Sequence, residues 1–168
     1  YGVFELNHSN NRIKNIFQLQ PNANPITAAG LDNNGIFWIG NRDGLMRYDP
    51  KQKILKKIKT SLFNEVSTLV ADSTGRLWIG AQNMVFLYLI QENKFVAFGE
   101  SDGVIPNEFL YKPSLVAANG DVYLGGVKGL LHIKKSIPAI TADAPVIELM
   151  ELDLDGVPLA IDRYGKAN

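Results

Sequence analysis

The sequence predicts an all-β protein built from repeated units, and three observations carry this prediction. A segment of glycine, two residues, an aromatic residue, an aliphatic residue and glycine occurs at 35–40, 75–80 and 120–125. A second apolar run begins four residues after each closing glycine. Apolar spacing is two or continuous throughout, never the three-four spacing of a helix. Because the segments start 40 and 45 positions apart, which is typical of a propeller blade, we expect an incomplete β-propeller of about three four-stranded blades plus a partial one.

Each full unit reads as four short strands separated by turn residues. In the first unit these are expected at 26–32, 35–40, 44–49 and 54–59, and in the second at 65–72, 75–80, 84–90 and 94–98. Asp32 and Asp72 open turns that close on glycine three positions later, as a type I turn favours. The innermost strands are expected at 26–31, 67–70 and 115–117.

The strand pattern also divides the chain. The run at 2–6 matches the run at 44–48 and lies 42 positions earlier, so it is the tail of a preceding unit. We expect a partial blade at 1–20 and blades at about 21–60, 61–100 and 101–137. The chain begins at Tyr1 rather than methionine and shows no signal peptide, so we expect it to be part of a longer protein.

Aromatic residues and glycines hold fixed places in the repeat. One position of the second strand is always aromatic, and there a large ring can fill the space between neighbouring blade sheets. Glycines open each of these segments after a turn and close it, and small residues such as Ala28, Ala29 and Gly30 let strands approach closely near the propeller axis. The predicted structural residues are Trp38, Trp78, Tyr123, Gly35, Gly40, Gly75, Gly80, Gly120 and Gly125.

Composition excludes several classes of function. Seventeen basic and seventeen acidic residues balance, which argues against a nucleic-acid or membrane-surface partner, since both usually need a basic surplus. The basic run at 51–59 alternates with apolar residues and is interpreted as a solvated strand face. Without cysteine there is no disulfide, thiol catalysis or thiolate metal site. The longest apolar run, 84–90, has the length of a strand and not of a membrane-spanning helix.

No motif indicates catalysis, a metal or a cofactor. His8 and His132 have no identifiable nucleophile partner, and the loop that starts at Asp32 lacks the alternating oxygen ligands of a calcium site. The segment 125–129 lacks the ending of a phosphate-binding loop. Acidic residues at 148–155 alternate with apolar ones, as on the polar face of a strand.

The residues with the best claim to ligand contact lie in loops. Propeller ligands commonly meet one face, which is built from the turns between second and third strands and from the connections between blades. Basic side chains there could bind an acidic sugar, and amides and carboxylates could bind hydroxyls, although each could also be an ordinary solvated loop tip. The candidates are Asn41, Arg42, Asp43, Asn64, Glu65, Gln82, Asn83, Asn107, Glu108 and Lys128.

The pattern D-x-x-G-x-x-W-I-G-x-x-x-G-L-x-x-Y, from Asp32 to Tyr48, resembles the two-component regulator propeller repeat. The segment 106–109, followed by 120–130, resembles the last blade of such propellers, and 144–159 resembles the opening strand and turn of the immunoglobulin-like β-sandwich module that follows them. The sequence departs from the pattern at Met84, which replaces a glycine, at Ala117, which replaces the turn aspartate, and at Pro113, which falls where an inner strand is expected.

This resemblance implies that the chain is the C-terminal part of a periplasmic sensor propeller, with residues 138–168 as linker and start of the immunoglobulin-like module. The family's hybrid histidine kinase/response regulators are anchored in the inner membrane and respond to glycan-derived oligosaccharides. The implied function is ligand sensing and signal relay without catalysis in this chain. A structural or protein-interaction propeller is the alternative, and a propeller glycoside hydrolase or lyase is the least favoured. We also expect the terminal blades to self-associate or to pack against further blades of a longer chain.

Overall fold

The computed structural model describes residues 2–105, 108–109, 114–136, 152–154 and 157–159. Their regular structure is antiparallel strand, apart from one 3-10 turn at Glu100–Asp102 that ends at Gly103, whose φ is 84°. The all-β prediction is therefore confirmed for the described residues. The sequence missed the short 3-10 turn, which lies in the connection after the second full blade.

Two four-stranded sheets form the centre of the molecule. The first full blade contains β3 (Ala28–Leu31), β4 (Phe37–Asn41), β5 (Gly44–Asp49) and β6 (Ile54–Lys57), and the second contains β7 (Thr68–Ala71), β8 (Arg76–Ala81), β9 (Met84–Leu89) and β10 (Lys94–Phe98). In each sheet the strands lie in sequence order and pair antiparallel. β3 is shorter than predicted, but bonds from Thr27 N to Gly40 O and from Asp32 N to Ile36 O prolong its pairing.

Smaller sheets flank the two full blades. On one side β1 (Gly2–Asn7) pairs with β2 (Arg12–Gln18), which are the outer strands of the predicted partial blade. On the other side β11 (Ser114–Val116), β12 (Val122–Gly126) and β13 (Gly129–Ile133) form a three-stranded sheet. Four strands are predicted for this unit, and its described residues form three of them. Residues 137–151 lie outside the described part of the chain. β14 (Leu152–Leu154) and β15 (Val157–Leu159) form a separate hairpin.

Some predictions fall largely outside the described part of the chain. Pro113 and Asn107 are not described, and of the predicted immunoglobulin-like segment only the β14–β15 hairpin is.

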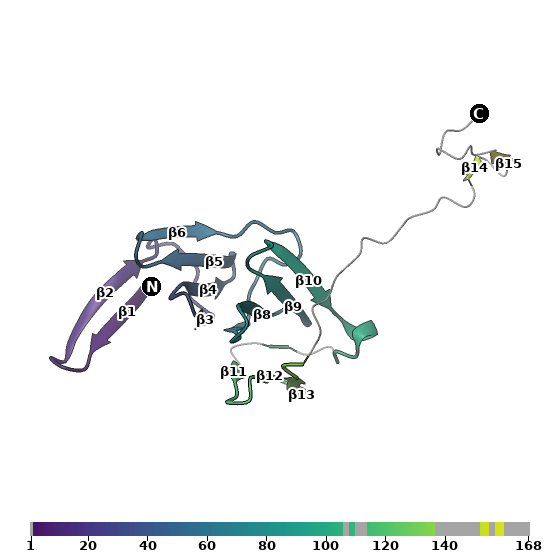
Figure 1. Cartoon of the computed structure of the whole chain (residues 1–168). Helices are drawn as coiled ribbons and strands as arrows, with labels where there is room; N and C mark the ends of the chain where they lie inside the picture. The colour runs from purple at the N-terminus through teal and green to yellow at the C-terminus, as the bar shows by residue number, and fades with distance from the viewer. Residues whose placement is uncertain (1, 106–107, 110–113, 137–151, 155–156, 160–168) are drawn as a thin grey trace.

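The first strands of the three units lie next to one another. β3 contacts β7, and β7 contacts β11, so the predicted inner strands gather at one edge while the outer strands fan away from them (Figure 1). Shared inner edges and diverging outer edges are the geometry of neighbouring propeller blades. The molecule is an incomplete β-propeller, as the repeat predicts.

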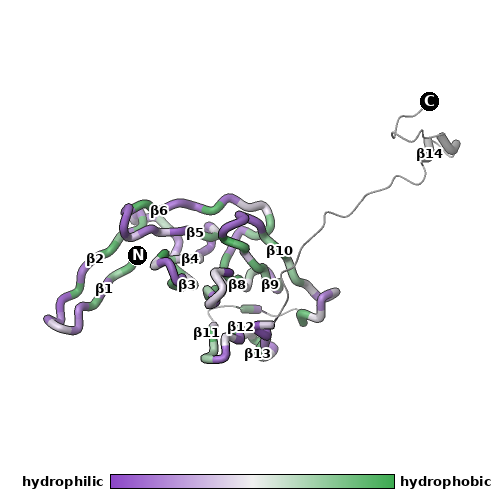
Figure 2. The backbone as a smooth tube through the Cα atoms, viewed as in Figure 1, coloured by the Kyte–Doolittle hydropathy of each residue, from purple (hydrophilic) through white to green (hydrophobic). Residues whose placement is uncertain are grey.

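The hydrophobic core lies between the blades and not within any one of them. One cluster joins the first full blade to the second and includes Trp38, Leu45, Leu69 and Phe86. A second cluster joins the second blade to the third, and a third joins the partial blade to the first full blade. Because both faces of the second blade are covered, β9 is a run of apolar residues without alternation. Figure 2 shows it as a hydrophobic stretch, in contrast to the hydrophilic tip of the β1–β2 hairpin.

The two tryptophans are buried between blades, as predicted. Trp38 is 1% exposed and Trp78 is 2% exposed. Each indole Nε1–H donates to the turn aspartate six residues earlier, at 2.9 Å from Trp38 to Asp32 and 3.0 Å from Trp78 to Asp72. The aspartates therefore close the turn and also satisfy a buried indole, a second role that the sequence pattern did not predict.

The third unit has other residues at the aspartate and tryptophan positions. Ala117 holds the aspartate position and Tyr123 the tryptophan position, so the buried acceptor and the indole donor are both absent from this unit. Tyr123 is only half-buried and stacks on His132 with ring centroids 4.6 Å apart. No blade follows the third unit among the described residues, so the expectation that Tyr123 fills a space between blade sheets stays a prediction.

Two of the predicted structural glycines mark close approaches between blades. A Cβ at Gly80 would lie 2.6 Å from Thr68 Cγ2 and 2.7 Å from Phe109 Cγ, and a Cβ at Gly40 would collide with the side chain of Val66. In both cases the second strand of one blade ends against a residue from the connection to the next blade. The glycines therefore allow that connection to pack closely onto the sheet.

Candidate ligand-binding face

The turns between second and third strands meet the connections between blades on one face of the molecule. Val66, in the connection between the two full blades, donates its backbone N–H to Asn41 O at 3.0 Å. Val127, in the β12–β13 turn, donates to Glu108 O at 3.0 Å. These bonds connect the two kinds of loop that the sequence singled out, and they place both kinds at the same edge of the blades.

Two adjoining cavities lie between these loops. One of about 210 Å³ includes Gln82 in its lining, and one of about 190 Å³ includes Lys128; Asn83 and Glu108 line both. We call the residues around them the loop cluster: Glu65, Ser67, Gln82, Asn83, Glu108, Phe109, Val127 and Lys128. Five of the ten candidates from the sequence are thereby brought together: Glu65, Gln82, Asn83, Glu108 and Lys128.

The remaining candidates lie beside the loop cluster or outside the described residues. Arg42 reaches Glu65 in an exposed ion pair, Nε to Oε1 at 3.8 Å. Asn64 is exposed but lines neither cavity. Asn107 is not described.

Asn41 and Asp43 have a structural role in their turn. Asn41 is 1% exposed; its Oδ1 accepts the backbone N–H of Asp43 at 2.8 Å, and its Nδ2 donates to Asn24 O at 3.3 Å. Asp43 accepts a further bond from Asn24 Nδ2 at 2.9 Å. The expectation that Asn41 faces a ligand is not met, because its amide is buried and already bonded.

The β8–β9 turn presents two amide side chains in an unusual backbone conformation. Gln82 and Asn83 have φ values of 48° and 64°, in the left-handed region. When both central residues of a two-residue hairpin turn have positive φ, no glycine is required after them. The departure of Met84 from the glycine pattern follows from this geometry. Glutamine is less common than asparagine in the left-handed region. The turn places the two amide side chains of Gln82 and Asn83 at the cavities.

The loop cluster offers hydrogen-bonding groups of both kinds. Gln82 and Asn83 supply amide donors and acceptors, Ser67 a hydroxyl, and Glu65 and Glu108 carboxylate acceptors. Phe109 lies beneath them and is 2% exposed, so it supports the site without offering an open ring face. Ser67 and Phe109 were not predicted as site residues. Phe109 belongs to the segment 106–109, which resembles part of the last blade of two-component regulator propellers. Nothing in the sequence distinguishes Ser67.

Groups for metal binding are not assembled in this part of the chain. Within the described ranges, no three His, Cys, Asp or Glu side chains are arranged to hold a metal ion. His132 lies in the third unit, where its Nε2 is 2.8 Å from Asp121 Oδ2. Its neighbours there are Asp121 and Tyr123.

Comparison with known proteins identifies the repeat. Residues 60–83 match the model of the family described as two component regulator propeller. This chain carries a two-component regulator propeller repeat. The matched residues run from the connection before β7 to Asn83 and therefore include Glu65, Ser67 and Gln82 of the loop cluster. None of the curated proteins matches the chain.

Solved structures confirm the propeller fold around that repeat. The chain is similar to the extracellular domain of BT4673 from B. thetaiotaomicron in two structures. One is described as a hybrid two component system (21% identity, TM-score 0.58, 82% of this chain and 19% of that chain), the other as a one component system (17%, 0.58, 79% and 18%). This chain thus spans about a fifth of the length of those domains.

An enzyme shares the fold to a similar degree. A catalytically inactive virginiamycin B lyase from Staphylococcus aureus, solved with quinupristin, has 12% identity and a TM-score of 0.55 over 83% of this chain and 50% of that chain. Because sensors and an enzyme share this architecture, fold alone does not decide the function of this chain. The described part of the chain has no helix long and apolar enough to cross a membrane.

Proposed function

We propose that this chain is a non-catalytic part of the ligand-sensing region of a hybrid two-component sensor and that it recognises a glycan-derived oligosaccharide. One observation carries the proposal: amide and carboxylate side chains from different blades converge on two adjoining cavities in a chain with a two-component regulator propeller repeat. The extracellular domains with the same fold support a location outside the cytoplasm.

The chemistry of the loop cluster suits sugar hydroxyls. A hydroxyl both donates and accepts, and amides beside carboxylates offer both partners within a short distance. Two carboxylates, at Glu65 and Glu108, are accompanied by two cations, at Arg42 and Lys128, so the face has no strong excess of either charge. Such a surface favours a polar ligand with many hydroxyls over a strongly charged polymer.

The position of the cavities suits signal relay. The lining residues come from the connections before the second and third blades and from the turns of those blades. A ligand that contacts both blades stabilises the relative position of the blades in which those contacts are best formed. Binding therefore shifts the population of the protein toward that arrangement. In the proposed parent protein, this shift reaches a membrane-anchored histidine kinase through the segment that follows the propeller.

Titration of the 168-residue chain with defined oligosaccharides tests the proposal by calorimetry. Asn83→Gly removes an amide at both cavities without backbone strain, since glycine accepts a φ of 64°. Asn11→Gly is the matched control, because Asn11 is also exposed, has a φ of 52° and lies in the distant β1–β2 turn. We expect about tenfold weaker binding for Asn83→Gly and unchanged binding for the control.

Three results would count against this function. Equal loss in both variants would mean that the loop cluster is not the binding site. Absence of binding across neutral and acidic oligosaccharides would favour a structural or protein-interaction role. Release of new reducing ends during incubation would show that the chain is a glycoside hydrolase or lyase and not a binding module.

A further inference from the structure

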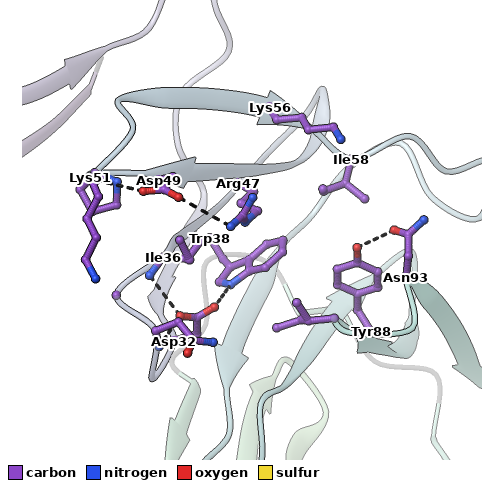
Figure 3. Close-up of a pocket in the computed structure, with 14 residues that line it drawn as sticks. Asp32, Ile36, Trp38, Arg47, Asp49, Lys51, Lys56, Ile58, Tyr88 and Asn93 are labelled. Carbon is purple, nitrogen blue, oxygen red and sulfur yellow. Dashed lines mark hydrogen bonds and ion pairs between the residues drawn. The ribbon is translucent and has the colours of Figure 1, made fainter.

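A larger cavity of about 500 Å³ lies between the two full blades, at the opposite edge from the loop cluster. β4 starts beside this cavity at Phe37 and runs to Asn41 near the loop cluster, and β5 returns to Asp49 at the cavity. Its volume is in the range of small-molecule sites. Figure 3 shows residues that line this cavity, among them Arg47 and Trp38 from the first full blade and Tyr88 from the second.

Two cations face each other across neighbouring strands at this cavity. Arg47 on β5 and Lys56 on β6 are directly opposite in the strand register, and both line the cavity. Like charges in such a pair destabilise a sheet. Lys56 belongs to the basic run interpreted as a solvated face, and it is exposed. An anion bound between Lys56 and Arg47 would relieve the repulsion between these two side chains. This part of the basic run is therefore also suited to binding an anion.

The nearby carboxylates are committed to the turns that hold them. Asp32 Oδ1 accepts the backbone N–H groups of Asn34 and Ile36, and its Oδ2 accepts the indole of Trp38. Asp49 Oδ1 accepts the N–H groups of Lys51 and Gln52, at 2.9 and 3.1 Å. Asp49 Oδ2 lies 3.8 Å from Arg47 Nη2, a long ion pair that neutralises the guanidinium only in part.

The next blade interface places apolar residues where this one has cations. By the repeat, Leu87 corresponds to Arg47 and Val96 to Lys56, and they too are directly opposite. Leu87 is buried and Val96 packs against the same cluster. The same architecture is therefore stable with an apolar pair, and the structural role of this position does not call for two cations.

Apolar side chains form one wall of the cavity, which Asn34, Lys51 and Asn93 also line. Trp38 and Tyr88 pack edge to face, 5.7 Å between ring centroids, beside Ile58 and Ile90. The Tyr88 hydroxyl donates to Asn93 Oδ1 at 2.7 Å. Burial raises the pKa of Tyr88, and the positive charge of Arg47 opposes this rise. The Arg47 guanidinium is therefore close enough to Tyr88 to interact with it electrostatically.

We propose that this cavity binds an organic carboxylate, with the carboxylate between Arg47 and Lys56 and an apolar body against Tyr88, Ile58 and Ile90. A guanidinium binds a planar carboxylate through two parallel bonds, and an inorganic anion would leave the apolar wall uncovered. No residue of the loop cluster takes part, so the site is independent of the proposed oligosaccharide function, and failure of either leaves the other standing.

Benzoate, a carboxylate on an apolar ring, is the probe, and uncharged benzamide is its control. The chain has two tryptophans, so a ¹H–¹⁵N spectrum of the full chain contains two indole N–H signals, which Trp78→Phe assigns. Trp38 lines the cavity, whereas Trp78 holds the equivalent position at the next interface and serves as an internal reference. We expect benzoate at about millimolar concentration to shift the Trp38 signal saturably, with benzamide at least about tenfold weaker.

The double variant Arg47→Leu with Lys56→Val gives this interface the apolar pair of the next one. It should retain the fold and lose the benzoate response by about tenfold or more, with unfolding by urea no easier than for the unchanged chain because the like-charge pair is removed. Equal responses to benzoate and benzamide, a full benzoate response in the double variant, or no saturable shift of Trp38 would each overturn the proposal.

Discussion

The aspartate that opens each turn of the full blades does two things at once. Asp72 illustrates this: its Oδ1 accepts the N–H groups of Thr74 and Arg76, while its Oδ2 accepts the Trp78 indole at 3.0 Å and Arg76 Nε at 2.7 Å. Burial alone would raise the pKa of Asp72, but the bonds from Thr74, Trp78 and Arg76 outweigh it and lower the pKa below its usual value. The charged carboxylate therefore stabilises the folded state.

A pH series of urea unfolding tests this role with Asp72→Asn. Because folding lowers the pKa of Asp72, its contribution is fully present above the unfolded value of about 3.9 and is lost as pH falls through the folded value. We expect Asp72→Asn to lower the free energy of unfolding by about 1–3 kcal/mol near neutral pH, with the difference shrinking at acid pH. A difference that does not change with pH would contradict the role of the charge.

Truncation of the interblade tryptophans tests the packing that surrounds them. Trp38→Ala and Trp78→Ala should each cost about 3–5 kcal/mol in the free energy of unfolding, the usual loss for a large buried aromatic. Tyr123→Ala should cost less, on the order of 1 kcal/mol, because Tyr123 is half-buried and stacks on His132. Denaturant titration of the three variants ranks them, and equal costs would contradict the difference between the units.

At the scale of elements, a blade is held by its neighbours more than by itself. The next-to-last residue of the second strand in each full blade is a glycine that a residue of the next connection covers, Val66 over Gly40 and Phe109 over Gly80. The same connections carry Glu65 and Glu108 of the loop cluster. The close packing at these glycines therefore also fixes the backbone position of two glutamates of the loop cluster.

Gly80→Ala should overpack the junction with the third blade. The added methyl would lie 2.7 Å from Phe109 Cγ, so we expect a loss of about 1–3 kcal/mol in the free energy of unfolding. In a Phe109→Ala background the same change should cost less, because the contact with the ring is then gone and only the contact with Thr68 Cγ2 at 2.6 Å remains. Additive costs in this double-mutant cycle, measured by urea unfolding, would show that the two residues do not share the junction.

Periodicity predicts the elements, but it does not predict side-chain partners between them. The spacing of glycines and aromatics located β5 and β10 to the residue, because hairpin turns fix where such strands begin and end. The Asp72–Trp78 bond was missed because the turn alone accounts for the aspartate. Asn41 was placed at a ligand because loop position does not reveal that its amide is buried.

The site shows the same limit. The sequence placed Gln82 and Glu108 on one face because propeller loops alternate between two edges, and they do line one cavity. The cation pair at Arg47 and Lys56 depends on cross-strand register, so a run of alternating lysines could only be interpreted as a solvated face.

At the scale of the whole molecule, apolar residues are exposed on the sheets at both ends of the row of blades. Leu6 and Ile13 are cross-strand neighbours on the β1–β2 hairpin and are 50% and 71% exposed. On the third unit, Leu115 and Leu130 are 50% and 65% exposed. Interior blade faces instead bury such residues against a neighbour, as Leu77 and Leu87 do at 0% and 1% exposure.

We propose that these end surfaces associate with a second copy of the chain. Light scattering at increasing protein concentration should show a rise in average molecular mass. Association removes exposed apolar surface from water, which lowers the free energy. Ile13→Lys combined with Leu130→Lys should reduce that rise. Leu62→Lys is the matched control, since Leu62 is 45% exposed but lies in the connection between the two full blades. A chain that remains monomeric at high micromolar concentration, or an equal effect of the control, would show that these surfaces do not drive association.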